Sequence, residues 1–129
     1  MKEVLDKFKD LIKSLESEHG QFLVFALFLR VEPFETWDLI ISADWLSPSE
    51  MNSYRLIASK LQEVLTESES LQFSRIVLLK PDDPTIKFLL DLETVKNGAY
   101  KEFSGEALTE KFKFTIKRAY LLRSLKQAS

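Results

Sequence analysis

Three aspartates lie at the ends of predicted strands, where carboxylates can gather. Asp38 lies at the start of a predicted strand over 37–43 and Asp44 follows its end, while Asp82 follows another predicted strand over 71–80. Clustered carboxylates at such ends can hold Mg²⁺ and support phosphodiester hydrolysis. Against this, no predicted strand carries the acid-x-lysine pattern of metal nucleases, and Asp82 also suits a turn. A metal-dependent enzyme acting on a phosphorylated substrate or nucleic acid is therefore the alternative function.

Other catalytic chemistry has few residues to use. The sequence contains no cysteine, one histidine and three glycines, which excludes disulfides, thiolate metal sites and a cysteine nucleophile. His19 precedes Gly20 at the predicted end of a helix, where an imidazole interacts favourably with the helix dipole. The glycines are isolated and form no phosphate-binding loop. We expect no cofactor, no resident metal and no catalytic activity.

Basic residues are concentrated near the C-terminus. Six of the 18 Lys and Arg residues fall within 111–129, a segment without Asp or Glu. Read as a strand, it gives one face a row of cations that could bind anions: Lys111, Lys113 and Lys117, with Arg118 nearby. A lysine-protected edge strand is the plainer interpretation. Phe112 and Phe114 would point to the opposite face, so no stacking platform forms and nucleic-acid binding is not expected.

The elements that position these residues indicate an α+β fold. Apolar residues at three- and four-residue steps predict a helix over 2–18, and the apolar run 22–29 predicts a central strand. A strand over 37–43 should complete an antiparallel hairpin. Ser47-Pro48-Ser49-Glu50 predicts the start of a second helix, with Ser47 as its cap, and Asp83-Pro84 that of a third.

The order is then α-β-β-α-β-α-β-β, a mostly antiparallel sheet of three to five strands with helices on one face. Residues 107–123 leave an alternative open. They alternate like a strand, but Leu108, Phe112, Ile116 and Tyr120 also fit one helix face, which would give α-β-β-α-β-α-α. The opening order resembles that of small scaffold domains of the roadblock and profilin-like kind over about the first 80 residues. No motif accompanies this resemblance, and a fold does not fix a function.

The sheet is expected to have a second, partly apolar face. Ile40, Ile76 and Leu78 would lie there, opposite the helices, and such a face suits a protein contact. Trp37 and Trp45 are ordinary core or helix-packing residues in the plainer interpretation, and interface anchors in the other.

The whole chain of 129 residues has the size of a single domain. No apolar run approaches the ~20 residues of a membrane-spanning helix, and the charged start is unlike a signal peptide. These features predict a cytoplasmic, soluble protein without membrane contact. The leading hypothesis is a non-catalytic protein acting through protein contacts, as a homo-oligomer or with a protein partner.

Overall fold

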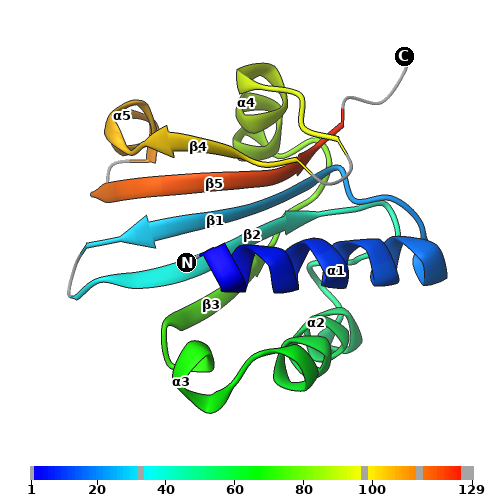
Figure 1. Cartoon of the computed structure of the whole chain (residues 1–129). Helices are drawn as coiled ribbons and strands as arrows, with labels where there is room; N and C mark the ends of the chain where they lie inside the picture. Colours follow the sequence, from blue (N-terminus) through cyan, green and yellow to red (C-terminus); the bar gives the residue numbers. More distant parts are fainter. Residues whose placement is uncertain (1, 32–33, 97–98, 113–114, 126–129) are drawn as a thin grey trace.

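The structure is a computed structural model that describes residues 2–31, 34–96, 99–112 and 115–125. It is an α+β fold with a five-stranded mixed sheet in the strand order β3-β2-β1-β5-β4 (Figure 1). The elements in chain order are α1 Lys2–His19, β1 Val24–Arg30, β2 Thr36–Ser42, α2 Met51–Val64, α3 Glu67–Ser70, β3 Phe73–Leu78, α4 Pro84–Leu92, β4 Lys101–Ser104, α5 Glu106–Phe112 and β5 Ile116–Ser124.

Helix α1 forms where the apolar periodicity predicts it. Its buried stripe packs on the sheet, and Gly20 follows with a φ of +122°, a conformation that glycine adopts without steric cost. An ion pair also ties this end of α1 to the sheet. Arg123 Nε donates to Glu16 Oε2 at 3.0 Å, and Phe22 N donates to the same oxygen at 3.0 Å.

The first two strands form the predicted antiparallel hairpin. Val24 pairs with Ser42 and Arg30 with Thr36, and β1 lies at the centre of the sheet between β2 and β5. Its apolar residues on both faces are consequently buried. The prediction of a central strand is confirmed.

Helix α2 connects β2 to a parallel β3, which makes the sheet mixed rather than mostly antiparallel. The predicted cap of this helix is wrong. The helix begins at Met51, its N-cap is Glu50, and no side chain caps it. Ser47 Oγ lies instead 3.0 Å from Ser49 Oγ. By contrast, the Asp83 cap of α4 is confirmed, because its Oδ1 accepts from Thr85 N at 2.9 Å.

The C-terminal segment contains both predicted structures in succession. Residues 106–112 form helix α5, and 116–124 form strand β5. Gly105 permits the tight turn before α5, since a Cβ there would lie 1.5 Å from the Ile116 carbonyl oxygen. The helical pattern thus applies to residues 106–112 and the strand pattern to residues 116–124.

Helices cover both faces of the sheet, so the prediction of helices on one face is wrong. One hydrophobic core joins α1 and α2 to the sheet. A second core joins Ile86 and Leu89 of α4 and Leu108 of α5 to the opposite face. In Figure 1, α1 crosses one side of the sheet, while α4 and α5 lie at the β5–β4 side. In the part of the chain that the structure describes, no helix is long and apolar enough to cross a membrane.

The expected second face is also composed differently. Ile40 belongs to the α4–α5 core and is 7% exposed, whereas Leu78 and Ile76 belong to the α1–α2 side. The prediction that these three share one uncovered face is wrong. An irregularity in the β2–β3 pairing explains part of the error. Trp37 pairs with Phe73 and Asp38 with Arg75, which leaves Ser74 as an extra residue.

Candidate functional site

Strand β3 is an edge strand with little protection. Within the described residues it pairs with β2 alone. Its sequence, Phe-Ser-Arg-Ile-Val-Leu, carries one charge and no proline. Long apolar edges are templates for pairing with another strand, and proteins commonly blunt them with lysine, proline or a covering element. The β3 edge therefore presents the backbone groups that an incoming strand requires.

The pairing with β2 shows which backbone groups face outward. Trp37 N donates to Gln72 O at 2.9 Å, and Leu79 N donates to Ile41 O at 3.0 Å. Ile76 and Leu78 lie directly opposite Leu39 and Ile41. In each pair of a parallel ladder, one residue bonds the neighbouring strand through both its N–H and its C=O. The residue opposite it directs its own N–H and C=O away from that strand. Ile76 thus offers its backbone N–H and C=O groups at the open edge, whereas Leu78 has the same orientation but is only 3% exposed.

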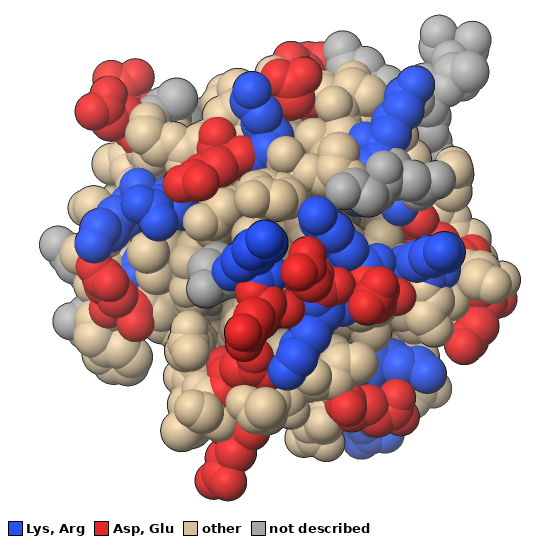
Figure 2. Space-filling view, in the orientation of Figure 1, with Lys and Arg blue, Asp and Glu red and all other residues tan. Residues whose placement is uncertain are grey.

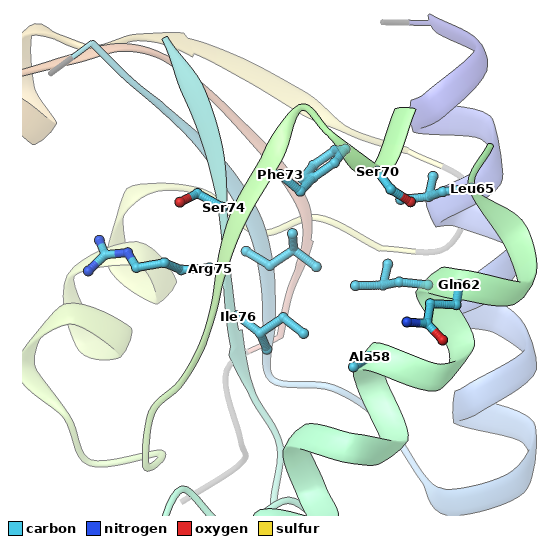
Figure 3. A pocket seen from close by; sticks show the side chains of 10 residues that line it. Ala58, Gln62, Leu65, Ser70, Phe73, Ser74, Arg75 and Ile76 are labelled. Carbon is cyan, nitrogen blue, oxygen red and sulfur yellow. The ribbon is translucent and has the colours of Figure 1, made fainter. Parts of the chain in front are cut away.

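An apolar pocket adjoins this edge. It has a volume of ≈ 300 Å³ and lies between β3, α2 and α3, with Leu39 of β2 in its lining. Ile76 and Phe73 point into it from the strand, facing Ala58 and Leu65, while Gln62 extends from α2 (Figure 3). Leu71, two residues before Phe73, is 81% exposed. The pocket and edge together form a continuous candidate surface, which we call the β3 edge site.

Ser74 and Arg75 point away from the pocket (Figure 3). Arg75 Nη2 donates to Asp38 Oδ2 at 2.9 Å, although the arginine side chain stays 53% exposed. Asp38 itself is 1% exposed and also receives Arg30, whose Nε and Nη2 lie 3.0 Å and 3.2 Å from the two carboxylate oxygens. Burial raises the pKa of Asp38, but the hydrogen bonds from Arg75 and Arg30 outweigh it and hold that pKa below its ordinary value.

The three aspartates of the predicted metal site do not form a cluster. Asp38 is buried between its two arginines, whereas Asp44 and Asp82 are exposed in the turns after β2 and β3. Among the described residues, no group of three His, Cys, Asp or Glu side chains could hold a metal ion.

The predicted basic face is not a row along one strand. Lys111 lies in α5, and Lys113 lies outside the described residues. Lys117 Nζ is 2.8 Å from Glu35 Oε1, and Arg118 Nε is 3.1 Å from Glu102 Oε1. Figure 2 shows the same mixture, with positive and negative groups interspersed across the visible face. The strand interpretation of Lys111 and Phe112 was wrong because α5 extends to Phe112.

Both tryptophans have intramolecular partners. Trp37 is 7% exposed and packs against Tyr120, with ring centroids 5.5 Å apart. Trp45 stacks on His19 at 4.8 Å and donates from Nε1 to Gln21 O at 3.2 Å. His19 thus joins the end of α1 to the loop before α2, a structural arrangement that agrees with its predicted position at the helix end.

Comparison with known proteins finds no matching family model, no matching curated protein and no matching solved structure. The β3 edge site therefore rests on the geometry of the chain itself. The sequence predicted Ile76 as an interface residue on the opposite face of the sheet and did not predict the pocket. Phe73 and Ile76 are three residues apart and would lie on opposite faces of a regular strand. Both line the pocket because β3 contains a bulge.

Proposed function

We propose that the chain is a non-catalytic protein-binding module that uses the β3 edge site to take up a strand of another protein or of a second copy. The observation that carries this proposal is the unpaired, apolar edge of β3 directly beside an apolar pocket. Strand addition of this kind gains affinity from main-chain hydrogen bonds and specificity from pockets for alternate side chains. We place the protein in the cytoplasm, because a chain without cysteine has no need of an oxidising compartment.

The pocket supports a protein ligand in particular. Six of its ten lining residues are aliphatic or aromatic, and the polar ones are Gln62, Ser70, Ser74 and Arg75. The side chains of Ser74 and Arg75 point away from it (Figure 3). An extended peptide alternates its side chains between two faces, so it can place one in the pocket while its backbone pairs with Ile76. Neither requirement calls for a catalytic group.

A library of random decapeptides displayed on phage tests this function. We expect the wild-type chain to enrich apolar, β-forming sequences, and Ala58→Phe to lose this enrichment because the added ring fills the pocket. Ser59→Phe is the matched control: it adds the same ring on α2 at an exposed position outside the pocket lining. Equal enrichment by Ala58→Phe and the wild type, or no enrichment by either, would contradict the proposal.

A further inference from the structure

The chemistry of the incoming strand follows from the two sides of β3. This inference rests on the proposed function, because it specifies the ligand of the same edge. The pocket side of β3 is apolar, with Phe73 and Ile76, and the opposite side carries Arg75. A strand that pairs with β3 meets both sides, since its successive side chains alternate between them.

Arg75 has donors to spare for a ligand. A guanidinium has five N–H donors, and the contact with Asp38 engages Nη2. The Asp38 carboxylate also accepts hydrogen bonds from Arg30. More than half of its side chain is exposed. A carboxylate from a partner can therefore approach the remaining N–H groups, which suit planar, two-point recognition.

We propose that the β3 edge site binds an extended segment of a partner protein in which an acidic residue stands next to an apolar one. The residue opposite Ile76 shares its face and enters the pocket. Its neighbour, opposite Arg75, lies on the other face and carries the carboxylate. Backbone pairing with Ile76 supplies the register that places both side chains.

A second copy of the chain fits this edge less well. If two β3 strands pair antiparallel about Ile76, Arg75 of one copy lies opposite Val77 of the other. The two Arg75 side chains are then diagonal neighbours, about 7–8 Å apart on the same face. Like charges at this spacing repel, and neither copy provides the carboxylate. Charge complementarity thus favours a different, acidic partner strand.

Two synthetic peptide pools test the inference. Both have a fixed central residue, Glu in one pool and Gln in the other, and neighbours randomised over Val, Ile, Leu and Thr. Fluorescence anisotropy should show that the wild type binds the Glu pool about 10-fold more tightly, the effect of one charge-assisted hydrogen bond. Arg75→Gln should abolish this preference, whereas Arg75→Lys should retain part of it. Arg55→Gln, on an exposed position of α2, is the control that should keep it in full.

The outcomes separate the two proposals. Equal binding of both pools by the wild type would overturn the acidic ligand but leave the protein-binding edge intact. Failure of both pools to bind would overturn both proposals. A native mass at twice 15.0 kDa, with the dimer disrupted by Ala58→Phe, would assign the edge to a second copy and overturn the acidic partner. Thermal unfolding of each variant verifies that it folds.

Discussion

At the scale of single residues, Asp38 is the most consequential charge in the described structure. Three hydrogen bonds from two arginines hold it in a buried position between β1 and β3. A carboxylate that looks like a metal ligand in the sequence is thus part of the framework that orients Arg75. Its partners Arg75 and Arg30 lie 37 and eight residues away from it in the chain. No local sequence pattern reveals that the three side chains meet.

Asp38→Asn should destabilise the fold by about 3 kcal/mol, because it removes the charge of a buried carboxylate that two arginines contact. Urea unfolding near neutral pH measures this loss. Glu102→Gln is the control, since its pair with Arg118 is half exposed on both sides and such pairs contribute about 0–1 kcal/mol. Equal losses in the two variants would contradict this role of Asp38.

The pH dependence of the same carboxylate has a definite sign. Its pKa in the folded chain lies below the ordinary value of 3.8, so the unfolded chain binds the proton more tightly. The stability that Asp38 contributes is complete above that ordinary value and is lost as the pH falls through the lower, folded pKa. Wild-type stability should therefore decline below about pH 4 more steeply than that of Asp38→Asn. Parallel acid-unfolding curves would contradict this.

Ser42 offers the opposite case, a buried hydroxyl without a partner. Its side chain is 1% exposed, and its Oγ has no hydrogen bond. Ser42→Ala should be neutral or raise the free energy of unfolding by up to about 1 kcal/mol, since it removes an unsatisfied polar group. Ser53→Ala is the matched comparison: Ser53 Oγ accepts from Ser47 N at 3.0 Å, and its loss should cost about 1 kcal/mol. Denaturant unfolding would show the reverse order if this account were wrong.

At the scale of elements, helix α2 begins without a capping side chain. Glu50 occupies the N-cap with extended φ and ψ of −109° and 123°, a conformation in which aspartate bonds the N–H groups of the first turn. Glu50→Asp should raise the free energy of unfolding by about 0.5–1 kcal/mol. Ser47→Ala should change it by less than about 0.5 kcal/mol. A larger loss in Ser47→Ala, measured by thermal unfolding, would restore the cap that the sequence suggested.

The elements that the sequence predicted correctly are those whose interacting residues lie close together in the chain. Helix α1, the β1–β2 hairpin and the α4 cap depend on residues close in the chain, and all three were predictable. The parallel pairing of β2 and β3 is not local, and the extra residue Ser74 reverses the expected faces of Ile76 and Leu78. The β3 edge site escaped prediction for the same reason, because an edge is a property of the whole sheet.

At the scale of the whole molecule, two hydrophobic cores enclose the centre of the sheet, and β3 stays at its margin. Burial rises from β3 to β1 and β2, whose residues are nearly all buried. The molecule therefore combines a buried central sheet with an edge strand that pairs, among the described residues, with β2 alone. In this account the fold serves to present that edge, with the pocket on one side and Arg75 on the other.

Residue-resolved amide hydrogen exchange tests this claim most directly, with and without a peptide selected on the wild-type chain. The account predicts that exchange of the Ile76 amide slows on peptide addition, because this N–H group becomes paired. The amide of Leu79, already bonded to Ile41 O, should change little. Protection that spares Ile76, or that appears only on α1 or α4, would contradict strand addition at β3.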